Sequence, residues 1–271
     1  MILLHLKPVE TLAFQGSQWH HYVVNHEQDF SPSAMIMIVE RLLSSLIIQT
    51  DVLFRLPCEP YFTIYNILMN KRLNSLVETF PALESCRSEI QQTFDLLHEV
   101  YANDGKLLLC GNGGSAADSD HIAGELLKGF TCSRPLDDAW KTELGSDLSD
   151  KLQGALPAIP LTGFNSFHSA FNNDCDPYYS FAQLTWALGR AGDSLLCIST
   201  SGNSKNVIYA TIVAHAKGLK TIGLTGQSGG ELLNKVDVCI RAPASEVDKV
   251  QEFHLPIYHC LCLMLEDAFF A

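Results

Sequence analysis

Leu195–Ser204 reads LLCISTSGNS, an apolar run that leads directly into four hydroxyl side chains around a Gly-Asn pair. The run predicts a buried strand over Ser194–Ser199, and a helix is expected to follow over Lys205–Lys217. Free N–H groups at a helix N-terminus, together with nearby hydroxyls, can cradle one phosphate dianion. A serine-rich turn that only caps the helix is the alternative, but capping needs one hydroxyl rather than four. We therefore predict a phosphate site made by Ser199, Thr200, Ser201 and Ser204.

Strands and helices alternate on both sides of this motif. Short apolar runs predict strands at Lys106–Cys110, Ala158–Thr162, Lys220–Thr225 and Val236–Arg241. Helical spacing or position predicts helices over 73–80, 86–101, 116–127, 179–188 and 230–235, and a last helix from about residue 248. Such alternation is typical of an α/β fold with a doubly wound parallel sheet flanked by helices.

A glycine-rich turn, GNGGS, joins the first of these strands to its helix at Gly111–Ser115. Glycines at this position let the backbone approach an anion. The turn also fits the dinucleotide fingerprint G-x-G-x-x-A, but the next strand runs into Gly163–Asn165 without the acidic residue that would hold a ribose. A nicotinamide cofactor is therefore a weaker interpretation. The lysine of a Walker A motif is also missing from both motifs, so a nucleoside triphosphate is not implied.

Composition restricts the partners and the compartment. The formal net charge of −12 argues against nucleic acid or an anionic membrane, since both require a basic face. Nine cysteines without a CxxC pair indicate free thiols in a reducing cytosol, so we expect a cytoplasmic protein. The apolar stretch Ala34–Phe54 contains Glu40, Arg41 and Asp51, which disfavours a membrane span.

Two segments interrupt the regular pattern. Residues 1–68 show no clear alternation, although a helix is plausible within Ser33–Gln49. We interpret them as an N-terminal extension outside a core domain of residues 69–271, with Met69 as a possible natural start, so that a truncation beginning there should fold and remain active. Residues 131–154 are polar and irregular and predict a loop or an inserted hairpin.

Five blocks carry a family resemblance: GNGGSAADSDHIAGEL, NNDCDPYYSF, GDSLLCISTSGNSKNV, GLTGQSGGEL and VDKVQEFHLPIYH. Over about residues 72–267 the chain resembles bacterial phosphoheptose isomerases of the sugar isomerase (SIS) domain family. The resemblance implies a flavodoxin-like, three-layer fold and a homotetramer. It also implies conversion of sedoheptulose 7-phosphate to D-glycero-D-manno-heptose 7-phosphate through an enediol.

The resemblance also implies a set of metal ligands, usually for zinc. His121 and Glu125 are four residues apart on one helix, and Gln251 and His259 are eight apart on the last helix. These four residues match the family's ligand positions, and two His, one Glu and one Gln suit zinc chemically. Glu125 and His259 would also supply the acid and base for proton transfer.

The resemblance extends to the substrate. The residues that match its contacts are Asn112, Gly113, Gly114, Glu125, Asn173, Asp174, Ser199, Thr200, Ser201, Ser204 and Gln251. Asp248 also matches a family aspartate, without an assigned role. We expect His254 to be structural and His98 to have no catalytic role, and we leave the role of His168 open.

Other functions remain open from the sequence. SIS domains also serve as non-catalytic modules, one of which binds a bacterial replication initiator, but that relative lacks the pattern of His121, Glu125 and His259. Another phosphosugar isomerase or a phosphosugar sensor is a third possibility, because residues 131–154 replace a shorter family connection near the substrate. Pro256, between Gln251 and His259, is expected to kink the last helix.

Overall fold

The computed structural model describes residues 2–7, 10–15, 18–22 and 71–270, and it divides the chain into two units, Met1–Ile64 and Tyr65–Ala271. In the first unit β1 (Ile2–Lys7), β2 (Glu10–Gln15) and β3 (Gln18–Tyr22) form an antiparallel sheet in sequence order. The sequence pattern did not predict these strands. The predicted helix within residues 33–49 and the boundary before Met69 lie outside the described residues, so both stay predictions.

The second unit is built on a parallel sheet of five strands in the order β5-β4-β6-β7-β8. The strands are β4 (Leu107–Gly111), β5 (Ala158–Pro160), β6 (Ser194–Ser199), β7 (Lys220–Thr225) and β8 (Val238–Arg241). Each coincides with a predicted strand to within about two residues. The predicted doubly wound α/β sheet is thereby confirmed.

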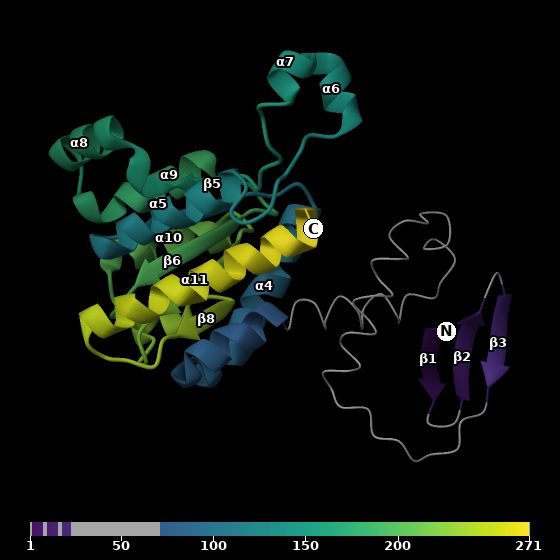
Figure 1. Ribbon diagram of the computed structural model, residues 1–271. Helices are drawn as coiled ribbons and strands as arrows, with labels where there is room; N and C mark the ends of the chain where they lie inside the picture. The colour runs from purple at the N-terminus through teal and green to yellow at the C-terminus, as the bar shows by residue number, and fades with distance from the viewer. Residues whose placement is uncertain (1, 8–9, 16–17, 23–70, 271) are drawn as a thin grey trace. The chain divides into compact units, whose positions relative to one another are not determined.

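Helices cover both faces of this sheet because side chains alternate along each strand. On one face Leu107 and Leu109 pack with α4 (Arg87–Ala102), α5 (Gly114–Leu127) and α11 (Val247–Phe270). On the other, Leu108 and Cys110 pack with α9 (Ser180–Leu188) and α10 (Lys205–Ala216). Figure 1 shows α11 lying across the sheet beside α4. The result is three layers.

The connections reverse direction beside β4, which determines where a ligand can bind. After β4 the chain passes through α5 to β5 on one side, and it then returns to place β6 on the other side of β4. Ligands of open α/β sheets bind at such a switch point, outside the carboxyl ends of the strands. The glycine turn follows β4 and the STSGNS loop follows β6, so both predicted motifs lie at this switch point.

Several segments differ from the sequence-based expectation. Residues 131–154 contain two short helices, α6 (Asp138–Leu144) and α7 (Ser146–Ser149), which stand away from the rest of the unit in Figure 1. An unpredicted helix, α8 (Asn165–Asp174), follows β5. Helix α11 contains Pro256 without a break, and the kink expected there stays a prediction.

The remaining elements are short. Residues 71–79 are helical, and 3-10 turns occupy Pro81–Cys86, Leu161–Gly163, Pro177–Tyr179 and Gly230–Asn234. None of the helices that the structure describes has the length and apolar composition needed to span a bilayer.

Candidate functional site

The hydroxyl-rich loop connects β6 to α10. Ser199 Oγ lies 3.0 Å from Ser204 Oγ, so the first and last hydroxyls of the motif meet across the loop. Ser204 occupies the N-cap position of α10, yet within the described chain its side chain makes no capping hydrogen bond. A turn that served only to cap the helix would use this hydroxyl on the backbone. The Ser204 hydroxyl contacts Ser199 instead, which favours a role in ligand binding over a role as a cap.

Glycine holds the middle of this loop in its conformation. Gly202 has a φ of 67°, and a Cβ at this position would overlap the backbone of Gly229. Asn203 Oδ1 accepts a hydrogen bond of 2.9 Å from the Glu231 N–H. Ser201 Oγ accepts a 3.1 Å hydrogen bond from the Asn203 N–H. The loop is therefore fixed against the turn after β7, with its hydroxyls held before any ligand arrives.

A reciprocal amide pair joins this loop to the glycine turn. Asn112 Nδ2 donates to Asn206 Oδ1 at 3.0 Å, and Asn206 Nδ2 donates to Asn112 Oδ1 at 2.8 Å. Asn206, in the first turn of α10, was not singled out from the sequence. Its position directly after the hydroxyl motif was the available signal. The pair fixes the two loops that flank the switch point relative to each other.

Glycine is also required where α5 begins. Gly113, with a φ of 57°, is the N-cap residue of α5. A Cβ on the next residue, Gly114, would overlap the side-chain amide of Gln251. Gln251 therefore lies directly against the glycine turn, which joins one predicted metal ligand to the predicted substrate loop.

Three of the predicted metal ligands come together from two helices. His121 Nε2 lies 3.3 Å from Glu125 Oε1 on α5, and His259 Nε2 on α11 lies 3.4 Å from the same His121 nitrogen. Burial lowers the pKa of His259, and the neighbouring His121 lowers it further while Glu125 opposes the shift. Lys128 Nζ donates to the other carboxylate oxygen, Glu125 Oε2, at 2.9 Å, which leaves Oε1 on the side of His121.

The distances match metal coordination in part. Ligand atoms bound at about 2.0–2.1 Å in a tetrahedron are roughly 3.3–3.4 Å apart, and the His121–Glu125 and His121–His259 pairs have these separations. Within the described residues, however, no three His, Cys, Asp or Glu side chains are already grouped to hold a metal ion. The residues therefore fit a metal by their chemistry and by two pair distances.

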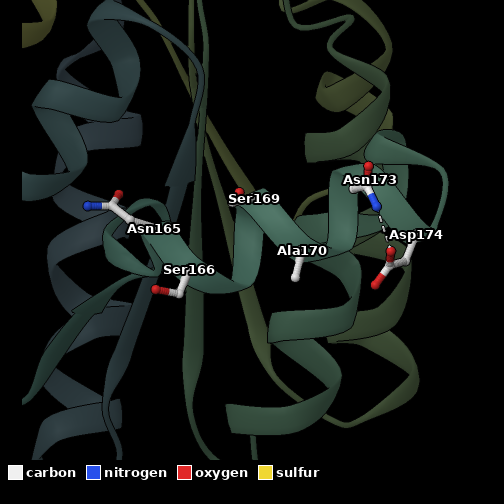
Figure 2. A pocket seen from close by; sticks show the side chains of 6 residues that line it. All are labelled: Asn165, Ser166, Ser169, Ala170, Asn173 and Asp174. Carbon is white, nitrogen blue, oxygen red and sulfur yellow. Dashed lines mark hydrogen bonds between the residues drawn. The ribbon is translucent and has the colours of Figure 1, made fainter.

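Two predicted substrate residues lie elsewhere. Asn173 and Asp174 end α8, where Asn173 Nδ2 donates to Asp174 Oδ1 at 2.8 Å. They line an open hollow whose lining residues all belong to α8, as Figure 2 shows. The structure thus places this pair on an exposed helix face, apart from the residues gathered around His121.

Three other histidines and Asp248, which the sequence analysis considered, make contacts outside this group. His254 is fully buried, which agrees with the structural role expected for it. His98 packs between Phe94 and Phe269. His168 Nε2 lies 2.8 Å from the carbonyl of Leu161 and so ties α8 to the end of β5. Asp248 is exposed, with Oδ2 3.8 Å from Lys249 Nζ.

Arg134 is a buried residue next to this site that the sequence analysis did not identify. Its guanidinium donates to the carbonyls of Leu126, at 2.8 Å, and Glu125, at 3.1 Å, at the end of α5. It also pairs with Glu266 of α11. A lone arginine in an irregular segment gives no sequence signal of burial. Its contacts fix the helix end that carries Glu125.

The comparisons with known proteins identify the family of this chain. The SIS domain family matches residues 71–153 and 155–226, more than half of the chain. The chain belongs to the SIS domain family. The glycine turn, the hydroxyl loop, His121 and Glu125 all lie within the matched ranges.

The relatives of this SIS domain include enzymes. This chain is 39% identical over 181 residues to a phosphoheptose isomerase of Aneurinibacillus thermoaerophilus, and the match covers 67% of this chain and 82% of the relative. It is also 41% identical over 184 residues to the phosphoheptose isomerase of Thiobacillus denitrificans, and that match covers 67% of this chain and 84% of the relative. The expectation of an isomerase of the phosphoheptose type is confirmed by these relatives.

Solved structures give the same result. A phosphoheptose isomerase from Francisella tularensis aligns with a TM-score of 0.60 at 32% identity, covering 73% of this chain and 96% of that one. The enzyme from Neisseria gonorrhoeae aligns with a TM-score of 0.57 at 32% identity, covering 74% and 99%. The SIS domain therefore spans nearly all of each of these enzymes.

Proposed function

We propose that this SIS domain is a metal-dependent phosphosugar isomerase that converts sedoheptulose 7-phosphate to D-glycero-D-manno-heptose 7-phosphate. The observation that carries the proposal is the contact of His121 with both Glu125 and His259, at 3.3 and 3.4 Å, on a helix that begins at the glycine turn against which Gln251 lies. The names of the relatives support the same reaction class.

The phosphate of the substrate would lie at the hydroxyl loop. Ser199 and Ser204 present hydroxyls at the N-terminus of α10, where N–H groups and the helix dipole favour an anion. A chain with a net charge of −12 must hold an anion through such local donors. The Asn112–Asn206 pair would keep the sugar-binding turn at a fixed distance from this loop.

The reaction moves one proton between adjacent carbons. Glu125 and His259, on different helices, would act on the reacting edge as base and acid. Lys128 holds one carboxylate oxygen of Glu125, Oε2, and His121 lies against the other, Oε1, and this carboxylate would accept the proton from carbon.

His121, Glu125, Gln251 and His259 would hold the divalent metal, with zinc the first candidate. A divalent metal supplies electrostatic stabilisation of the negative charge that develops on the enediolate oxygens. Glu125 would then serve both as a ligand and as the base.

A coupled assay of sedoheptulose 7-phosphate isomerisation, run with added zinc or with EDTA, tests the proposal. We expect zinc-dependent turnover that Glu125→Gln abolishes and the matched control Glu78→Gln, on an exposed helix position, retains. Absence of turnover with wild-type protein that still binds sugar phosphates in a thermal-shift assay would instead support the phosphosugar sensor. Turnover of a different phosphosugar would redirect the substrate assignment, and absence of both turnover and binding would contradict the site.

We also propose a homo-oligomer, of which the tetramer is the first candidate. The hollow of Asn173 and Asp174 is lined by α8 alone, so a second surface facing α8 would be needed to enclose a substrate there. A second copy of the chain would supply that surface. Light scattering coupled to gel filtration should give a multiple of the 29.9 kDa chain mass, and a monomer with full activity would exclude this arrangement.

A further inference from the structure

The amide pair formed by Asn112 and Asn206 joins the two parts of the proposed site. Asn206 lies in the first turn of α10, two residues after Ser204 of the hydroxyl loop. Asn112 directly precedes the N-cap residue of α5, the helix that carries His121 and Glu125. In the proposed reaction the phosphate and the reacting carbons are at opposite ends of one sugar chain. The pair therefore connects the loop that would hold one end to the helix that would act on the other.

Two reciprocal hydrogen bonds keep either amide from turning alone. Asn112 Nδ2 donates to Asn206 Oδ1 at 3.0 Å, and Asn206 Nδ2 donates to Asn112 Oδ1 at 2.8 Å. If only the Asn112 amide turned by half a revolution, its oxygen would face the Asn206 oxygen and its nitrogen the Asn206 nitrogen. One contact would then join two acceptors and the other two donors. Turning one amide therefore breaks both hydrogen bonds.

A third hydrogen bond keeps the two amides from turning together, which would otherwise restore the pair. The Val207 N–H donates to Asn206 Oδ1 at 3.0 Å. Because a backbone N–H can only donate, the Asn206 atom that faces it must be the oxygen. Ser204, at the N-cap, makes no side-chain capping bond and so leaves this N–H to Asn206. The backbone of α10 thus determines the orientation of both amides.

The fixed orientation leaves defined groups of Asn112 for a ligand. A side-chain amide has two N–H hydrogens and two lone pairs on its oxygen, and the pair uses one of each on Asn112. One Nδ2 hydrogen and one Oδ1 lone pair remain. The space beside the turn is open, because a Cβ on Gly113 would have no atom of the described chain within 4 Å, its own neighbours aside. Sugar hydroxyls both donate and accept, so a hydroxylated carbon chain suits this donor and this acceptor.

We propose that Asn206 is a positioning residue that fixes the Asn112 amide in one orientation and thereby determines how Asn112 binds the hydroxyls of the sugar chain. Asn206 acts on the substrate through Asn112 and not by direct contact. The orientation of the amide depends on the three hydrogen bonds alone, whereas the effect on sugar binding rests on the proposed function. A residue that only capped α10 through the Val207 N–H would have no effect on Asn112.

Nitrogen-15 NMR tests the orientation without a ligand. The side-chain amide signal of Asn112 is the one that Asn112→Ala removes from the wild-type spectrum. We expect Asn206→Ala to shift this signal and to speed the exchange of its hydrogens with water, because both hydrogen bonds of the amide are lost. Asn103→Ala, which removes an exposed amide that donates to the Glu99 carbonyl at 2.7 Å, is the matched control and should leave the signal unchanged. The same shift and exchange rate in wild type and Asn206→Ala would overturn the proposal.

A double-mutant cycle tests the effect on the sugar. Calorimetry measures the binding of sedoheptulose 7-phosphate to wild type, Asn112→Ala, Asn206→Ala and the double variant. Loss of a neutral hydrogen bond weakens binding by roughly 2- to 10-fold, and we expect a loss of this size for Asn206→Ala. In the Asn112→Ala background the same change should weaken binding no further, because the side chain through which Asn206 acts is gone. Losses that add in the double variant, as a cap or a direct contact would give, would overturn the proposal.

Inorganic phosphate separates an effect on the sugar from an effect on the loop. Asn206→Ala should bind inorganic phosphate within about 2-fold of the wild type, because Asn112 does not belong to the loop that would hold phosphate. An equal loss of affinity for phosphate and for the sugar phosphate would mean that the loop itself had changed, and it would overturn the proposal. If the wild type did not bind sedoheptulose 7-phosphate, the proposed function would fail, and the NMR comparison would still decide whether Asn206 orients Asn112.

Discussion

The Arg134 guanidinium and the Glu266 carboxylate form an ion pair in which both side chains are 0% exposed, with Nη2 2.8 Å from Oε1. Glu266 also accepts hydrogen bonds from the N–H groups of Phe130 and Thr131, at 2.7 and 2.8 Å. Arg134 donates in turn to the last carbonyls of α5. The pair therefore joins the start of the inserted segment, the end of α5 and the last turns of α11, and it fixes the backbone that carries Glu125.

Removing one member of this pair should destabilise the fold. Glu266→Gln leaves a buried guanidinium without its counter-charge, which typically costs about 3–5 kcal/mol. We expect a loss of that size in the free energy of unfolding from urea titrations. The double change Arg134→Met with Glu266→Leu should cost less than the sum of the two single changes, because no buried charge remains unpaired. Additive losses would contradict this account of the pair.

Stability should also depend on pH through Glu266. Burial alone would raise its pKa, but the Phe130 and Thr131 N–H groups, the Thr131 hydroxyl and Arg134 lower it from 4.5 to about 2. A carboxyl whose folded pKa is lowered contributes stability above its unfolded pKa and loses it as the pH falls toward the folded value. The difference in unfolding free energy between wild type and Glu266→Gln should therefore be constant above about pH 4.5 and shrink toward pH 2. A difference that stays constant over this range would rule out the role of this carboxyl.

Ser204 should matter for binding and not for folding. Ser204→Ala removes a hydroxyl that does not cap α10, so the thermal unfolding midpoint should barely change. Loss of a hydrogen bond to a charged group costs about 1.5–3 kcal/mol, which predicts roughly 10- to 100-fold weaker binding of sugar phosphate. Calorimetry with the phosphosugar measures this effect. Ser85→Ala, which removes an exposed hydroxyl bonded to the Ala82 carbonyl, is the control and should bind as the wild type does.

Lys128 should affect turnover more than stability. Its ammonium holds Glu125 Oε2 from a side chain that is 58% exposed, and exposed ion pairs contribute only about 0–1 kcal/mol to folding. Lys128→Met retains the apolar stem but frees the carboxylate, so we expect kcat to fall by roughly 3- to 10-fold, within the range of acid–base effects. Lys249→Met, which breaks an exposed pair with Glu252 on α11, is the control. Equal kcat values for the two variants would show that Lys128 does not position Glu125.

The parts of the fold that depend on local sequence were predictable. The apolar runs that give β6 and β7 are bounded by turn residues, so both strands were predicted with their observed bounds. Helix α8 was missed because Asn165–Asp174 is polar and its apolar residues, such as Phe167, are only partly buried. The inserted segment lacks periodicity, and its two short helices were not predicted for the same reason.

The sequence by itself determined the doubly wound sheet, the hydroxyl loop and the pairing of His121 with Glu125 at helical spacing, because each depends on residues close together in the chain. Only the tertiary structure decided which distant groups meet. His259 reaches His121 across 138 residues, and Tyr258 reaches the other nitrogen of the same ring across 137. Such contacts depend on how α11 packs against α5 over one face of the sheet, and no local pattern encodes that packing. The burial of Arg134 against Glu266 has the same origin, since a charge can be buried only where the fold supplies its partner.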